Sequence, residues 1–181
     1  MRQILLVTLL LTILSVIGCA PTSETLGRAA NPYPLSEKPV ADTLVHLQTG
    51  TIVSMEQMFA DIGGDRIIYA GETHDNPASH RFQLAILNHL IERYPHHVAV
   101  GMEMFHHNQQ PVLDRWIAGE LDEKSFLRQL NWYQSWGIDY AYYRDLLTTM
   151  REHQIPIIAL NVSPEQKMAV MQGKQTTPEV D

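Results

Sequence analysis

One short segment sets the architecture of this chain: Val98-Ala99-Val100-Gly101-Met102. It is an unbroken apolar run, which is typical of a strand that a sheet buries on both faces. Two similar apolar runs occur elsewhere, Ile67-Ile68-Tyr69-Ala70 and Ile155 to Leu160, and the segments between the runs have helical periodicity. Buried strands that alternate with helices predict a parallel sheet with right-handed crossovers. We therefore expect an α/β fold with a mainly parallel sheet and flanking helices.

Capping residues locate several of the helices. Asn76 and Pro77 supply an N-cap and a proline at the first helical position of a helix expected to end near residue 94. Ser54 and Gln57 have the spacing of a capping box at the start of a short helix. Further helices are expected at residues 111–118, 123–130, 142–153 and 164–171, and a small N-terminal hairpin at residues 44–47 and 51–53.

Polar side chains follow each of the three predicted strands. Glu72 and His74 come after the first, Glu103 after the second, and Asn161 after the third. Ligands of open parallel sheets bind beyond the carboxyl ends of the strands, so we expect these side chains at one rim. Two carboxylates and an imidazole could hold a divalent metal or divide general acid and base roles. Alternatively, they could simply anchor loop backbone. The pair His96-His97 precedes the second strand and is expected at the far end.

The N-terminal residues predict export and lipidation. Arg2 precedes an apolar run over residues 4–17, which is shorter than the ~20 residues of a membrane-spanning helix. Val16-Ile17-Gly18-Cys19 fits a lipobox, in which a small residue precedes a lipidated cysteine. Cys19 is the only cysteine, so lipid explains it better than a disulfide or an incidental cysteine in a plain secretory signal. We expect residues 1–18 to be removed and Cys19 to anchor the chain in the cell envelope, at the outer membrane.

The rest of the chain is expected to be one domain on a tether. Residues 19–42 are rich in Pro, Ser, Thr and Ala, which is typical of a flexible linker. Residues 43–173 form the predicted α/β domain, and residues 174–181 a polar, disordered tail. The formal net charge of −7 argues against nucleic-acid binding, which requires a basic surface. A Gly-rich phosphate loop and a Gly-x-Ser-x-Gly elbow are both absent, so nucleotide binding and serine hydrolysis are not expected.

Four motifs follow one another along the predicted domain. They are GETHDNPASHRFQ from residue 71, VAVGMEMF from residue 98, the aromatic segment from residue 132 to residue 143, and IPIIALNV from residue 155. In this order they resemble the ChaN-like family of haem-binding, iron-regulated lipoproteins. That family is similar to a wider group with the TraB and Tiki proteins and the erythromycin esterases, which shares a Gly-x-x-His element and a downstream glutamate. By this resemblance Gly71, His74 and Glu103 carry the shared signature.

The resemblance implies a membrane-anchored protein that binds haem and acts in haem or iron acquisition, with a homodimer as a further expectation. Tyrosinate and histidine both serve as axial haem ligands. We expect Tyr140 or Tyr143 to be the ligand rather than His106 or His107, and Trp136 to contribute an apolar wall, although these aromatics could instead be core. The alternative function is a hydrolase of the wider group that uses Glu72, His74 and Glu103, with or without a metal.

The chain is expected to be shorter than its relatives. Three strands make a small sheet compared with the usual ~5 to 6, and nothing periodic follows residue 173. ChaN-like proteins normally continue past this point. We therefore expect the domain at residues 43–173 to be incomplete, with apolar residues exposed near its third strand.

Overall fold

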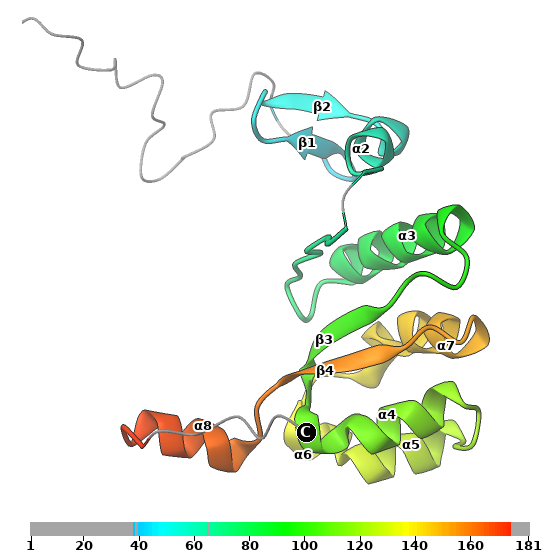
Figure 1. Cartoon of the computed structure of the whole chain (residues 1–181). Coiled ribbons are helices and arrows are strands. Elements are labelled where there is room, and N and C mark those ends of the chain that lie inside the picture. The colour runs from blue at the N-terminus through cyan, green and yellow to red at the C-terminus, as the bar shows by residue number, and fades with distance from the viewer. Residues whose placement is uncertain (1–37, 39, 65, 175–181) are drawn as a thin grey trace, which may run out of the picture. The chain divides into compact units, whose positions relative to one another are not determined.

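Figure 1 shows the computed structural model, which describes residue 38, residues 40–64 and residues 66–174. The predicted signal peptide, Cys19, most of the tether and nearly all of the polar tail lie outside the described residues. Two compact units divide the chain, with the boundary between Arg66 and Ile67. Among the described helices, none has the length and apolar character needed to span a membrane.

The first unit contains the predicted hairpin and one helix. β1 (Leu44–His46) pairs antiparallel with β2 (Thr51–Val53). Ser54 then caps α2 (Met55–Asp61) through the reciprocal bonds of a capping box with Gln57. Both features agree with the sequence prediction, because the local capping and turn residues alone specify them.

The second unit contains a parallel strand pair, which confirms the α/β class. β3 (Val100–His106) runs parallel to β4 (Ile157–Asn161), with Met102 opposite Ala159 at the last regular pair. Beyond Met102 the register shifts, and His106 lies opposite Asn161. Glu103 is therefore the first residue past the regular ladder.

The predicted first strand is wrong. Residues 67–70 form no strand within the described chain, and the side chain of Tyr69 is 92% exposed. One contact of the segment is a 2.9 Å hydrogen bond from Gln83 Nε2 to the carbonyl oxygen of Ala70. An apolar run becomes a strand only when a neighbouring strand pairs with it, and composition does not reveal whether that neighbour is present.

The helices of the second unit lie largely where the sequence places them. Those at residues 123–130 and 164–171 have the predicted bounds, the other predicted helices differ by a few residues at their ends, and the short helix at residues 132–135 was not predicted. The helices are α3 (Pro77–Arg93), α4 (Gln110–Ile117), α5 (Glu123–Leu130), α6 (Trp132–Ser135), α7 (Arg144–Glu152) and α8 (Pro164–Met171), with the 3₁₀ turns η1 (His107–Gln109) and η2 (Tyr140–Tyr142).

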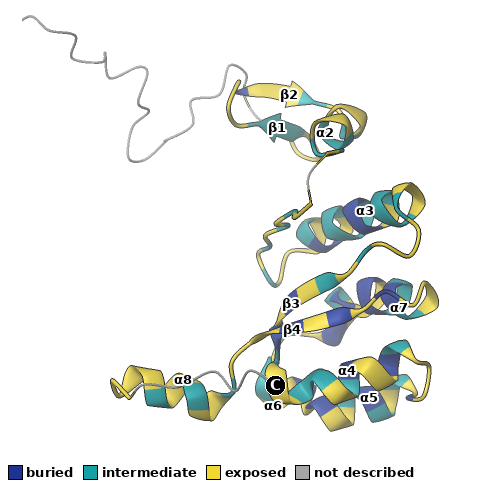
Figure 2. Cartoon of the chain, viewed as in Figure 1, coloured by how far each residue is buried: buried dark blue, intermediate teal, exposed yellow. Residues whose placement is uncertain are grey.

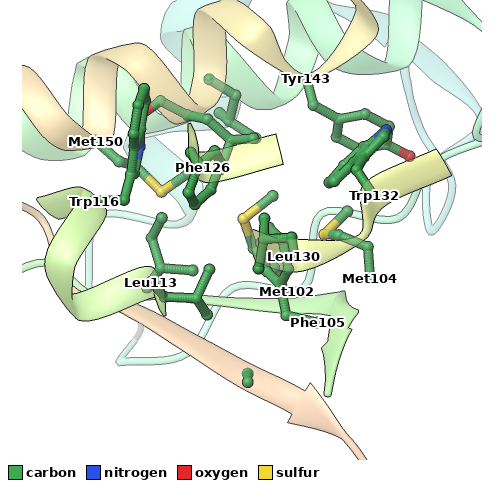
Figure 3. Close-up of a cluster of buried hydrophobic side chains, with 14 of the residues drawn as sticks. Met102, Met104, Phe105, Leu113, Trp116, Phe126, Leu130, Trp132, Tyr143 and Met150 are labelled. Atoms are coloured by element: carbon green, nitrogen blue, oxygen red, sulfur yellow. The ribbon is translucent and has the colours of Figure 1, made fainter. Parts of the chain in front are cut away.

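One face of the strand pair builds the core. Buried or half-buried residues alternate with exposed ones from residue 100 to residue 104 of β3 and from residue 157 to residue 160 of β4 (Figure 2). Met102 and Ile157 belong to the buried set, which forms one cluster with residues of α4, α5 and α7 (Figure 3). Each large apolar side chain buried in this way contributes about 1.5 to 3 kcal/mol. The cluster also includes Leu113, Trp116, Phe126, Leu130, Trp132, Tyr140, Tyr143, Leu147 and Met150.

The other face of the strand pair carries exposed apolar side chains. Ile158 and Leu160 of β4 are exposed, and Leu160 is 57% exposed. Leu160 lies over Gly101 of β3, where a Cβ atom would come within 2.9 Å of the leucine methyl groups. The predicted exposure of apolar residues near the third strand is confirmed. That the domain is incomplete stays a prediction.

The side chain of Gln110 bonds to the backbone of β4. Its Nε2 donates to the carbonyl oxygen of Ile157 at 2.7 Å, and its Oε1 accepts from the amide of Ala159 at 2.8 Å. Successive residues of a parallel strand direct their backbone groups to opposite edges of the strand. The carbonyl oxygen of Pro156 accepts from the amide of Val100 in β3, so the backbone groups of Ile157 and Ala159 point to the other edge. Gln110 therefore satisfies the edge of β4 that faces away from β3.

We expect Gln110→Ala to lower the free energy of unfolding by about 1 to 3 kcal/mol, because it leaves two backbone groups of β4 without partners. Urea denaturation of the purified protein measures this difference. Gln134→Ala is the matched control, since Gln134 is exposed on α6 and its removal should change stability by less than about 0.5 kcal/mol. Equal stabilities of the two variants would contradict the role given to Gln110.

Candidate functional site

Three of the predicted rim residues lie together. Glu72, His74 and Glu103 each offer a ligand atom, and these atoms lie within 4.8 Å of one another. His74 Nδ1 is 2.7 Å from Glu72 Oε1, and His74 Nε2 is 3.8 Å from Glu103 Oε1. The side chain of Glu72 is 7% exposed, whereas that of Glu103 is 63% exposed. The cluster therefore has a buried carboxylate, an imidazole and a carboxylate open to solvent.

The loop that carries Glu72 and His74 is attached to the start of α3. Asn76 Oδ1 accepts from the amide of Ala78, which fixes the first turn of the helix. His80 Nε2, one turn into the helix, is 2.9 Å from the carbonyl oxygen of His74. Glu72 and His74 are thus positioned by a helix cap, and not by the end of a strand as the sequence suggested.

Glu103 reaches the cluster from β3. It follows the last regular pair of the ladder, on the exposed face. Asn161 Nδ2 of β4 donates to the backbone carbonyl oxygen of Glu103 at 3.2 Å. The predicted rim residue Asn161 therefore supports the backbone beside the cluster and does not belong to the group of three.

Hydrogen bonds keep the buried carboxylate of Glu72 ionised. Burial alone would raise its pKa, but hydrogen bonds from Tyr143, His74 and Gln83 and the charge of His80 outweigh burial and hold the pKa below the ordinary 4.5. Tyr143 Oη donates to Glu72 Oε1 at 2.5 Å. Because Glu72 can only accept, a neutral His74 donates from Nδ1 and leaves the lone pair of Nε2 directed to the open side.

Sequence reasoning missed His80, which completes the buried side of the cluster. Its side chain is 6% exposed, and its Nδ1 makes no hydrogen bond and lies 3.5 Å from Glu72 Oε2. A carbonyl oxygen only accepts, so the contact with His74 requires a proton on Nε2. The available signal was helical spacing, since His80, Leu84, Leu87 and Ile91 form one stripe of α3.

The two tyrosines predicted as haem ligands lie in the core. The side chains of Tyr140 and Tyr143 are almost fully buried, and Trp132 makes edge-to-face contacts with both. Burial is the largest cause that raises the pKa of each phenol; the second is the charge of Glu123 for Tyr140 and the bond to Glu72 for Tyr143. Their role as ligands stays a prediction, and either phenol would have to leave the core to reach an iron atom.

The other predicted residues lie nearer the surface. Trp136 is half-buried, and its ring meets that of His74 edge to face at a centroid distance of 4.7 Å. Trp136 Nε1 also donates to Tyr143 Oη at 3.3 Å. His107 is exposed in η1, and His96-His97 is exposed in the turn before β3. Trp136 is thus the one predicted haem-contact residue that both borders the cluster and is partly exposed.

The second unit is thus an α/β fold in which a Gly-x-x-His loop and a strand glutamate lie beside a helix-flanked parallel strand pair. The sequence model of the family described as haem-binding uptake, Tiki superfamily, ChaN matches residues 58–180. The match spans more than half of the chain, so the chain belongs to this family, as the sequence resemblance predicted.

The fold is also similar to a solved structure of ChaN of Campylobacter jejuni, described as cofacial haem binding. The TM-score is 0.63 at 21% sequence identity, and the similarity covers 80% of this chain and 57% of that chain. This chain therefore spans little more than half the length of that relative. No curated protein matches the chain.

We expect Tyr143→Phe to lower the free energy of unfolding by about 1.5 to 3 kcal/mol, because it removes a hydrogen bond to a buried, ionised carboxylate. Chemical denaturation near neutral pH measures the change. Tyr133→Phe is the control, since the Tyr133 side chain is 58% exposed and its loss of a hydroxyl should have little effect. A Tyr143→Phe variant as stable as the control would show that the bond to Glu72 does not support the fold.

Proposed function

We propose that this protein binds haem and acts in haem or iron acquisition. The observation that carries the proposal is the family match over residues 58–180, which includes the whole of the second unit that the structure describes. The fold similarity to ChaN of Campylobacter jejuni supports it further. A homodimer is the assembly that we expect.

We also propose that lipid on Cys19 anchors the protein in the cell envelope, at the outer membrane. The basic residue Arg2, the short apolar run at residues 4–17 and the lipobox at residues 16–19 support this localisation. A tether over residues 19–42 would hold the folded part away from the lipid surface.

Cys19→Ser should leave the protein unprocessed, or release it from the membrane fraction, because the thiol that receives the lipid is lost. Fractionation of cells that express wild type and variant, with the size of the chain read by immunoblot, measures both effects. A Cys19→Ser protein that is still processed and membrane-bound would refute lipidation.

The described conformation limits how haem could be held. Exposed His107 could reach an iron atom without rearrangement, whereas Tyr140 and Tyr143 require the segment from Trp132 to Tyr143 to open. Half-buried Trp136 could then cover one face of the porphyrin. Tyrosinate and histidine both serve as axial ligands of haem iron, and we propose Tyr140 or Tyr143 as the ligand, with histidine as the alternative that the test below distinguishes.

Hemin added to the purified protein should give a Soret band with the high-spin ferric spectrum of tyrosine ligation. Tyr140→Phe and Tyr143→Phe, made singly, should include one variant in which this spectrum shifts or binding weakens. Circular dichroism of each variant establishes that it is folded. No Soret change in wild type would refute haem binding. Loss of the band in His106→Ala or His107→Ala, with both tyrosine variants unaffected, would identify a histidine ligand instead.

A hydrolase is the second candidate function, and the convergence of Glu72, His74 and Glu103 favours it. An imidazole held by a buried carboxylate can take a proton from water, with Glu103 beside it on the open side. Esterase and peptidase assays on wild type and on His74→Ala test this candidate. Turnover that is absent, or equal in the two proteins, would eliminate it.

A further inference from the structure

We infer that a hollow beside α5 and α6 binds a small planar anion, in which a phosphate or carboxylate group is attached to an aromatic ring. Lys124 and Arg128 hold the anionic group, and the ring of Tyr133 stacks on the ring of the ligand. The hollow includes no residue of the cluster around Glu72, and the inference does not depend on the proposed haem binding.

The hollow lies where α5 is followed by α6. Its volume is about 410 Å³, within the range of about 300 to 1,000 Å³ that is usual for small-molecule sites. Exposed Lys124 and Arg128 of α5 line it together with half-buried Leu127 and buried Trp132. Tyr133 of α6, whose side chain is 58% exposed, adds an aromatic surface. A charged part and an apolar part are thus offered to the same ligand.

The two cations of the hollow lack a carboxylate partner. Neither Lys124 nor Arg128 forms an ion pair with any residue that the structure describes, and Arg128 makes one long hydrogen bond, at 3.4 Å to Ser125 Oγ. The pKa of Asp122 is lowered mainly by hydrogen bonds from Ser125 and only weakly by these two charges. The Asp122 carboxylate is therefore engaged in the cap of α5, where it accepts from the Ser125 amide at 2.6 Å.

Arginines of the neighbouring helices α4 and α7 do have partners within the protein. Arg115 Nε lies 3.2 Å from Glu120 Oε2, and Arg144 Nε lies 3.1 Å from Glu123 Oε2. Arg151 donates to a backbone carbonyl oxygen at 3.3 Å. Pairing is thus common for the cations around α5, and the hollow collects two that are available to a ligand.

Helix stability does not explain the placement of these two cations. Lys124 and Arg128 are four residues apart on α5, so their like charges repel each other. Lys124 also lies in the first turn, where a positive charge opposes the helix dipole. Among the described residues that line the hollow, none is acidic, although the chain has a net charge of −7. An anion bound between the two side chains would relieve their repulsion.

The remaining lining residues favour an anion that carries a ring. The side-chain amides of Asn131 and Gln134 are exposed and make no hydrogen bond within the described part of the chain, so they can donate to the oxygens of a phosphate or carboxylate. The ring of Tyr133 can pack against an aromatic ring of the ligand. Because the hollow collects donors on one part and apolar surface on the other, it suits a planar anion better than a simple inorganic ion.

Titration of the haem-free full chain with phenyl phosphate, followed by the amide chemical shifts in NMR spectra, tests the site. The shifts should change in residues 124–134, and phenyl phosphate should bind about three- to tenfold more tightly than inorganic phosphate, which lacks the ring. Lys124→Gln and Arg128→Gln should each weaken the binding of phenyl phosphate by about three- to tenfold. Lys167→Gln is the matched control, since it removes an exposed cation of α8 outside the hollow.

Two variants of Tyr133 separate the ring from its hydroxyl. Tyr133→Ala should weaken the binding of phenyl phosphate and leave that of inorganic phosphate unchanged, whereas Tyr133→Phe keeps the ring and should bind both as wild type does. These positions are exposed, so the variants are expected to fold, which circular dichroism establishes.

The inference is overturned if wild type does not bind phenyl phosphate at millimolar concentrations, or if Arg128→Gln binds it as tightly as Lys167→Gln does. Equal affinities for phenyl phosphate and inorganic phosphate would overturn the assigned ligand class. Hemin added to Lys124→Gln and Arg128→Gln should behave as it does with wild type. Loss of hemin binding in both variants would show that the hollow belongs to a haem site and would overturn a separate ligand, whereas absent hemin binding in every protein, with phenyl phosphate still bound, refutes only the haem proposal.

Discussion

The buried carboxylate of Glu72 joins two parts of the second unit that are far apart in sequence. Through Oε1 it accepts from Tyr143, which follows 71 residues later, and contacts His74 in its own loop. Without these partners an ionised carboxylate at this depth would be costly, so the position of the loop and the position of the aromatic segment depend on each other. The pKa of Glu72 is low because hydrogen bonds from Tyr143 and His74 stabilise its charged form, so loss of either contact would raise this pKa.

This constraint also explains why the aromatic segment is both core and border of the cluster. The ring of Tyr143 packs with Trp132 inside the hydrophobic cluster, while its hydroxyl ends at Glu72. Trp136 also contacts both regions: it packs against the hydrophobic cluster, its indole N–H donates to Tyr143, and its ring meets that of His74 edge to face. From the sequence, the aromatic residues of this segment could be either core residues or residues that contact a ligand. Here one residue meets the core with its ring and the polar cluster with its hydroxyl.

Local signals predicted most of the helices because caps and periodicity are encoded in neighbouring residues. Asn76 with Pro77, and Ser54 with Gln57, specify helix starts that the structure contains. The convergence of Glu72, His74 and Glu103 was predicted through an assumed strand at residues 67–70, which the described chain does not form. The position of His74 follows from the helix cap instead. Helical spacing could have placed His80 on the buried stripe of α3. Its contact with Tyr143, and the depth of Tyr143 itself, depend on packing between α3 and the aromatic segment, which no local pattern in the sequence reports.

The side-chain amide of Gln110 affects whether a strand of another molecule can pair with β4. An unpaired strand edge beside exposed apolar side chains is a template on which another chain can add a strand, and such addition starts aggregation. Ile158 and Leu160 supply the apolar surface, but the backbone groups of Ile157 and Ala159 that an incoming strand would need are already bonded. A single glutamine side chain thus opposes the addition of another strand at this edge of β4, although the apolar side chains beside it remain exposed.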